Sequence, residues 1–176
     1  MADFRNIPGA QGSKGLRDNN PLNINAAGWK GEIALDGSEA IFSDTIFGFR
    51  AAAFELLRYY NSYGLTTINE IAARWAPVAD GNDPVNYAAN VAAAMGVGAD
   101  DPLTLDATQL GDLMAAMMIE ELGSSYANQI DQSEISTGIS MLSLPALTIV
   151  QGANGSGGLL LMAGIFAILF AVTKRN

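Results

Sequence analysis

Carboxylates are the side chains in this sequence that could carry out acid–base chemistry. The 176 residues include no histidine and no cysteine. Their absence excludes Ser-His-Asp triads, cysteine nucleophiles, histidine-ligated zinc, thiolate metal sites and disulfides. Aspartate and glutamate are the remaining usual general acids and bases. An enzyme of this composition would therefore move protons through a carboxyl group.

Glu121 is the clearest candidate, because it continues the apolar side of a helix predicted over residues 107–122. Five apolar residues form that side at helical spacing, and Glu121 follows at the next turn: Leu110, Leu113, Met114, Met117 and Met118. Partial burial there would raise the pKa of the carboxyl, as a general acid near neutral pH requires. The alternative is a solvated glutamate just before Gly123 ends the helix.

A second carboxylate could come from Glu32 or Glu39, on or beside a predicted hairpin, or from Asp44 just after it. Acids in such positions are more often solvated turn residues. The other acidic residues are better explained as turn and cap residues. The run 80–83 (DGND) lacks the length and the terminal glutamate of an EF-hand loop. We therefore expect no metal and no cofactor.

The charge balance bears on the class of partner. Nine basic residues stand against eighteen acidic ones, for a net charge of −9. Proteins that bind DNA or RNA normally present a basic face. We therefore expect no nucleic-acid partner.

Asparagines are concentrated in the segment 15–24 (GLRDNNPLNI), where Asn20 precedes a proline and Asn23 follows it. Such side chains hydrogen-bond nearby backbone, so the segment predicts an ordered loop leading into a hairpin. Amides held in this way also suit a groove that binds sugar hydroxyls and acetamido groups. The alternative is a capped turn with no ligand.

The elements that must position these residues give an α+β, mainly α fold. An Asp-Gly turn predicts a hairpin within 31–42, and apolar spacing predicts helices over 47–60, 67–75, 85–95 and 107–122. Capping residues and glycines mark their ends. We expect one domain over 15–130 and a flexible arm over 1–14, which lacks the pattern of a signal peptide.

The composition changes after residue 130. Residues 131–156 are rich in Ser, Thr and Gly and predict a linker, in which 139–150 could lie along a membrane interface or pack on the domain. Residues 157–173 contain no charged side chain and are followed by Lys174 and Arg175. As a helix they would span about 25 Å, near the short limit for crossing a bilayer. We expect a C-terminal transmembrane helix followed by a basic tail, 174–176. A buried core helix or a packing helix in an assembly is the alternative.

Several landmarks in order resemble a group of phage and prophage proteins described as structural or lysozyme-like virion proteins. The resemblance covers about 15–126 and rests on residues 15–24, Trp29-x-Gly31, 47–51 (FGFRA), 75–77 (WAP) and Tyr87. Asp18 departs from the group, which usually has asparagine there. The group commonly ends with a His-Glu-Asn-Gly-like sequence, and residues 120–123 (EELG) stand there, so its glutamate corresponds to Glu121.

The resemblance implies a circularly permuted lysozyme-like domain that cleaves peptidoglycan. Glu121 would protonate the glycosidic oxygen between N-acetylmuramic acid and N-acetylglucosamine. In a lytic transglycosylase it would then act as the base for anhydro-ring closure, whereas in a muramidase Glu32 or Glu39 would assist water. Asn20 and Asn23 would orient acetamido groups. Trp29 or Tyr126 would stack on a sugar ring.

Two interpretations of function follow. The first is a membrane-anchored enzyme of a phage virion with an internal membrane, which opens the cell wall during entry; its partners would be glycan strands, lipid and other virion or capsid proteins. The second is a non-enzymatic virion membrane protein that uses the domain for wall binding or assembly. A host-derived envelope protein is a third possibility that fits the phage-like pattern less well.

Deletion of residues 153–176 tests the predicted anchor. Removing the apolar segment should release the protein from membranes, because no other stretch of the sequence is long and apolar enough to span a bilayer. Flotation of full-length and truncated protein with lipid vesicles measures this. Continued flotation of the truncated protein would contradict the prediction.

Overall fold

Helices predominate in the computed structural model, which describes residues 3–142, and one antiparallel pair of strands accompanies them. The mainly α, α+β class expected from the sequence is confirmed. The helices are α1 (Lys14–Arg17), α2 (Thr45–Tyr63), α3 (Ile68–Trp75), α4 (Pro84–Met95), α5 (Ala107–Leu122), α6 (Ser124–Ala127) and α7 (Gln132–Ser140). The strands are β1 (Glu32–Asp36) and β2 (Glu39–Phe42), and 3-10 turns lie at Phe4–Asn6, Ala10–Gly12 and Val78–Asp80.

The four expected long helices and the hairpin are confirmed, and their ends follow local chemistry. The side chains of Asp44, Thr67, Asp83 and Asp106 accept hydrogen bonds from backbone N–H groups at the starts of α2, α3, α4 and α5. Gly64 and Gly96 adopt left-handed conformations that end α2 and α4. In the hairpin, Asp36 pairs with Glu39 around a tight turn at Gly37.

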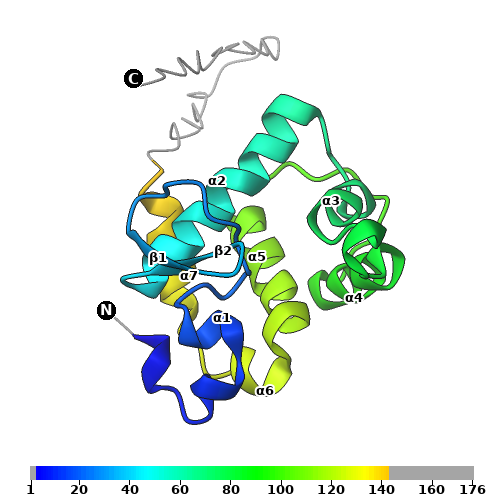
Figure 1. Ribbon diagram of the computed structural model, residues 1–176. Helices are drawn as coiled ribbons and strands as arrows, with labels where there is room; N and C mark the ends of the chain where they lie inside the picture. The colour runs from blue at the N-terminus through cyan, green and yellow to red at the C-terminus, as the bar shows by residue number, and fades with distance from the viewer. Residues whose placement is uncertain (1–2, 143–176) are drawn as a thin grey trace, which may run out of the picture. The chain divides into compact units, whose positions relative to one another are not determined.

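Helix α5 lies in the middle of the fold, between α3 and α4 on one side and α1 with the hairpin on the other (Figure 1). Its predicted apolar side is buried, with Leu110, Leu113 and Met114 fully enclosed and Met117 and Met118 nearly so. Helices α4, α6 and α7 all contact it. The C-terminal end of α5 therefore projects Glu121 from the best-packed element of the domain.

The N-terminal segment is not the flexible arm that the sequence suggested. Phe4 is only 1% exposed and meets the ring of Phe49 edge-on, with centroids 5.9 Å apart. The backbone N–H of Phe4 donates to Asn19 Oδ1 at 3.0 Å. Short 3-10 turns leave no helical periodicity in a sequence, and the segment therefore looks irregular from its sequence. Its order depends on the buried ring of Phe4, which the sequence pattern does not reveal.

The predicted linker also needs correction, because its first part forms α7 and belongs to the domain. Ile135 and Ile139 are buried, and the buried Glu134 accepts a hydrogen bond from the Thr45 hydroxyl. A Cβ at Gly138 would lie 2.7 Å from Phe49 Cβ, so α7 packs closely on α2 through a glycine. Small residues, which suggested a linker, are what permit this close approach.

No helix among residues 3–142 is both long and apolar enough to cross a membrane. The transmembrane helix predicted over 157–173, the rest of the predicted linker and the basic tail lie outside the described residues. That expectation stays a prediction.

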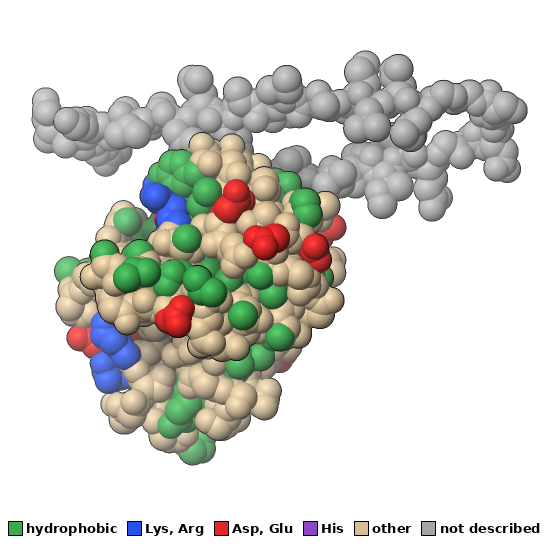
Figure 2. Space-filling view, turned by 90° about the vertical axis from the view of Figure 1, so that its right-hand side faces the viewer, with side chains coloured by type: hydrophobic (Ala, Val, Ile, Leu, Met, Phe, Trp, Pro, Cys, Tyr) green, Lys and Arg blue, Asp and Glu red, His purple; other side chains and the backbone are tan. Residues whose placement is uncertain are grey.

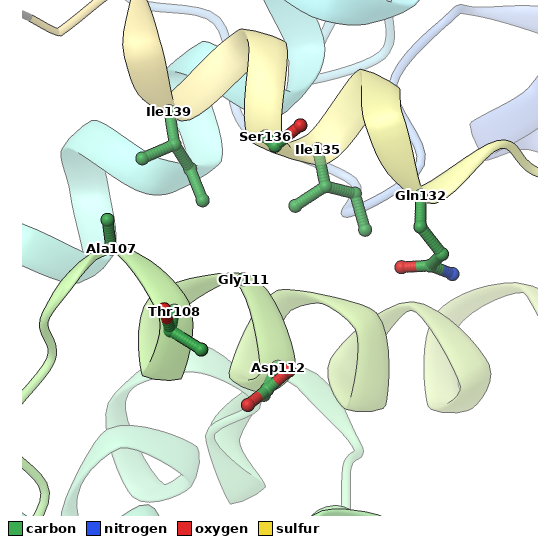
Figure 3. A pocket seen from close by; sticks show the side chains of 8 residues that line it. All are labelled: Ala107, Thr108, Gly111, Asp112, Gln132, Ile135, Ser136 and Ile139. Carbon is green, nitrogen blue, oxygen red and sulfur yellow. The ribbon is translucent and has the colours of Figure 1, made fainter.

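A shallow hollow of about 350 Å³ lies between α5 and α7. Figure 3 shows Ile135 and Ile139 pointing from α7 toward α5, where Gly111 leaves space. Asp112 is the only ionisable side chain in its lining. We interpret the hollow as loose packing between two helices and assign it no ligand.

Two helical glycines should respond oppositely to alanine. A Cβ at Gly48 in α2 would collide with the backbone oxygen of Asn19, so Gly48→Ala should cost about 1–3 kcal/mol of unfolding free energy. A Cβ at Gly111 would lie 3.7 Å from Ile139 Cδ1, an ordinary contact, so Gly111→Ala should gain about 0.5–1 kcal/mol. Urea denaturation of both variants measures this, and equal effects would contradict the packing described.

Candidate functional site

A cleft of about 850 Å³ in the described domain is lined in part by Glu121. The loop around Asn23 and the start of β2 form one wall, and residues of α2, α3 and α4 form the other. Five aromatic and five acidic residues line it. The residues on which the following argument rests are Asn23, Trp29, Glu39, Glu55, Arg58, Tyr59, Trp75, Asp80, Tyr87, Glu120 and Glu121.

The Glu121 carboxylate accepts hydrogen bonds from three separate parts of the chain. Asn23 Nδ2 donates to Oε2 at 2.8 Å. Trp75 Nε1 and the Tyr87 hydroxyl donate to Oε1 at 3.1 and 2.9 Å. The loop, α3 and α4 thus fix the orientation of one carboxyl group on α5. Oε1 accepts two of these bonds and Oε2 only one, so Oε2 is the oxygen better able to carry a proton.

Burial raises the pKa of Glu121 above its ordinary value of 4.5. The hydrogen bonds from Asn23, Tyr87 and Trp75 oppose this by stabilising the anion, and the negative charge of Glu39 adds to the rise. The net direction is upward, as the sequence argument expected. A carboxyl with a raised pKa that also has donors ready for its anion suits a group that releases a proton and takes it back.

Tyr87 is a fixed donor toward this carboxyl. Burial, with the nearby Glu121 carboxylate, raises the pKa of the Tyr87 hydroxyl far above its ordinary range. The phenol therefore keeps its proton at every physiological pH. Trp75 likewise has an N–H that only donates. Both groups favour the ionised form of Glu121 over the protonated form.

The two asparagines singled out from the sequence have different places. Asn23 lies in the cleft on Glu121, in a left-handed backbone conformation. Asn20 is 1% exposed, and its amide donates to Ile24 O and Ala40 O, both at 2.9 Å, and accepts from Ile24 N. Asn20 is therefore not brought to the cleft, and it instead ties the loop that carries Asn23 to β2.

The two candidates for a second carboxylate, Glu32 and Glu39, also lie in different places. Glu32 Oε2 accepts hydrogen bonds from the backbone N–H groups of Ala27, Gly28 and Trp29, at 2.9–3.2 Å, and does not line the cleft. It closes a loop. Glu39 lines the cleft and pairs with Lys14 Nζ at 3.0 Å. Of the two, only Glu39 is placed to act with Glu121.

Of the two predicted stacking residues, Trp29 lies in the cleft and Tyr126 does not. Trp29 Nε1 donates to Asn25 O at 2.7 Å, and its ring meets Phe54 edge-on. The Tyr126 hydroxyl instead reaches Gly9 O at 3.4 Å, so this ring packs on the N-terminal segment.

Sequence reasoning placed Trp75 and Tyr87 in helices but missed their part in the site. Both are amphipathic aromatics, with an apolar body for the core and one polar atom that needs a partner. Trp75 falls at the end of α3 and Tyr87 in the first turn of α4, on either side of a short connection. Two amphipathic aromatics on either side of a short connection, together with one glutamate on the apolar side of another helix, form the sequence signal that could have identified Trp75 and Tyr87 as site residues.

Glu121 should make the stability of the protein depend on pH in a predictable sense. Because its pKa is raised in the fold, the folded state binds a proton more tightly than the unfolded state. The unfolding free energy should therefore fall as pH rises from the unfolded pKa, near 4.5, through the higher folded pKa. Glu121→Gln removes this titration. The unfolding free energy of the variant minus that of wild type should therefore increase as pH rises through this range.

Urea denaturation at a series of pH values measures the effect, with Glu120→Gln as the matched loss of one charge from the same helix. A difference between Glu121→Gln and wild type that stays constant with pH would contradict the assignment.

Comparison with known proteins gives a relative among the bacteriophages. No protein-family model matches the chain. Over 122 residues the chain is 38% identical to Protein P5 of Pseudoalteromonas phage PM2, a match that covers 65% of this chain and 74% of the relative. Identity at this level over most of the relative reflects common descent. The chain belongs to the family of Protein P5 of phage PM2.

Proposed function

We propose that this chain is a phage virion protein that cleaves the glycan strands of peptidoglycan, with Glu121 as the general acid. The observation that supports the proposal is one half-buried carboxyl of raised pKa, held by three donors in an aromatic-lined cleft. Acid-catalysed cleavage of a glycosidic bond needs such a group and needs no histidine, cysteine or metal.

In this mechanism the proton of Glu121 passes to the glycosidic oxygen between N-acetylmuramic acid and N-acetylglucosamine as the bond to the anomeric carbon breaks. The carboxylate left behind is stabilised by the N–H of Trp75, the hydroxyl of Tyr87 and the amide of Asn23. It then accepts a proton from the attacking oxygen. In a lytic transglycosylase that oxygen is the muramic 6-hydroxyl, and an anhydro ring forms.

A hydrolytic variant needs a group that assists water, and Glu39 is the candidate. It lines the cleft, and its ion pair with Lys14 holds the carboxylate in place. Glu39 also lies near enough to Glu121 to affect its pKa. A transglycosylase does not depend on this second carboxylate, so the role of Glu39 distinguishes the two reaction types.

The walls of the cleft suit a chain of uncharged sugars. Trp29 and Trp75 are partly exposed and offer aromatic surface on which pyranose rings could stack. Asn25 and Asn82 offer exposed amides for hydroxyl and acetamido groups. A cleft with both kinds of group is typical of carbohydrate binding.

The phage relative and the predicted apolar segment 157–173 support the proposal that this activity serves entry into the host. An enzyme anchored in the internal membrane of a virion would confine wall cleavage to the point of contact with the host. A virion membrane protein that uses the same cleft only to bind the wall is the alternative, and the following experiment distinguishes it.

Glu121→Gln should lower peptidoglycan cleavage by about 10²–10⁴-fold, because it keeps the shape of the side chain and removes the transferable proton. The adjacent Glu120→Gln is the control, since Glu120 bonds Asn90 at 3.2 Å and takes no part in the mechanism. Purified sacculi are incubated with each protein, and the released muropeptides are identified by mass spectrometry.

Anhydromuramic products would identify a lytic transglycosylase, and muramic reducing ends a hydrolase. Equal activity of wild type and Glu121→Gln would contradict the role of Glu121. Intact sacculi after treatment with folded wild-type protein would contradict cleavage and favour the binding protein.

A further inference from the structure

Basic side chains are scarce on this acidic protein, and most of those described are neutralised locally. Arg5 pairs with Asp3, and Lys14 and Arg17 pair with acids of the hairpin. Figure 2 shows that on the side carrying α3 and α4 the Lys and Arg side chains lie toward one edge and leave the rest of that face without them. Against this background, a place where two arginines lie close together beside the cleft departs from the general charge pattern.

Two arginines gather around one exposed tyrosine where the end of α2 meets α3. The guanidinium carbon of Arg58 lies 5.4 Å from the ring centroid of Tyr63, and that of Arg74 lies 4.4 Å from the same centroid. Arg74 also lies 5.0 Å from the ring of Tyr59. Tyr63 is 46% exposed. We call Arg58, Tyr63 and Arg74 the arginine patch.

The arginine patch continues the cleft. Arg58 and Tyr59 line the cleft, and Arg58 is the only basic residue among the described residues that do so. Five carboxylates share that lining: Glu39, Glu55, Asp80, Glu120 and Glu121. A negatively charged part of a ligand would therefore be repelled along most of the cleft and attracted at this end.

The guanidinium groups retain donors for such a ligand. Glu55 bonds one terminal nitrogen of Arg58, whose side chain is 38% exposed, and the other terminal nitrogen has no hydrogen-bond partner among residues 3–142. Arg74 makes no ion pair with an acid in residues 3–142. Stacking on a ring occupies the face of a guanidinium and leaves the N–H groups at its edge free to bind carboxylates. The stacking also restrains both side chains before a ligand arrives.

We infer that the arginine patch is a subsite for the carboxylates of the peptide stem that branches from the muramic acid residues of the glycan. This inference rests on the proposed function, because it takes the glycan to occupy the cleft. The stem carries several carboxylates next to the sugar chain, so it is the anionic part of a ligand that is otherwise uncharged in the cleft. Two arginines on one ring match a ligand with more than one carboxylate.

The test compares soluble glycan strands that carry stem peptides with stripped strands, from which an amidase has removed the stems and in which the lactyl carboxyl exposed by that cleavage has been converted to its amide. Binding is measured by calorimetry in the Glu121→Gln background, which the proposed mechanism makes unable to cleave. Arg58→Met and Arg74→Met should each weaken binding of stem-bearing strands about fivefold and leave binding of stripped strands unchanged. Arg5→Met, which removes an arginine outside the cleft lining, is the control and should bind both as the parent does.

Each outcome decides between the inference and the function. If the arginine variants bind stem-bearing and stripped strands equally more weakly than the parent, the subsite is overturned. It is also overturned if they bind both as the parent does. In either case, tight binding of stripped strands would still support the glycan cleft. Absence of binding to both strands by the folded parent would overturn the glycan-cleft proposal itself.

Discussion

The need to satisfy one half-buried carboxylate organises this fold. An ionised carboxyl away from bulk water is costly unless donors surround it. Glu121 meets that requirement with Asn23, Trp75 and Tyr87, which lie 98, 46 and 34 residues away in the sequence. The loop after α1, the end of α3 and the first turn of α4 must therefore all converge on the end of α5. A cleft remains where these segments meet.

The same interaction explains why the neighbouring structure is so firmly held. Asn23 can reach Glu121 only because Asn20 ties its loop to β2 through buried hydrogen bonds. Asn19 in turn links that loop to Phe4 and to Phe42 O. The N-terminal segment, the loop and the hairpin thus form a chain of support behind one donor. Residues that seemed candidates for ligand binding serve the site by fixing it in place.

Much of this arrangement could be predicted from local sequence signals. Caps and apolar spacing gave α2 to α5, and the position of Glu121 on the apolar stripe of α5 gave its partial burial. Side-chain direction in the loop could not be predicted in the same way. Asn20 turns inward and Asn23 into the cleft because of left-handed conformations at Asn19 and Asn23, and an Asn-rich sequence does not say which residues adopt them. Glu32 and Glu39 likewise differ only in what the folded backbone brings near them.

Helix α7 and the N-terminal segment escaped prediction because both depend on tertiary contacts. Gly138 allows α7 to approach Phe49, and without knowledge of that neighbour a Ser-, Thr- and Gly-rich stretch resembles a linker. Phe4 is held by its contact with the same ring. Phe49 therefore contacts both α7 and the N-terminal segment, whose structures local sequence propensity does not predict.

The acids of the cleft form a graded set of environments. Glu39 is paired with Lys14, Glu55 with Arg58, and Glu120 bonds the amide of Asn90. Glu121 instead accepts hydrogen bonds from three neutral donors, and no ion pair reaches it among the described residues. A cation would lower the pKa of its carboxyl, whereas neutral donors orient it and let burial raise the pKa. Glu121 is thus the carboxyl of the cleft whose pKa is raised by burial, as the proposed proton transfer to a glycosidic oxygen requires.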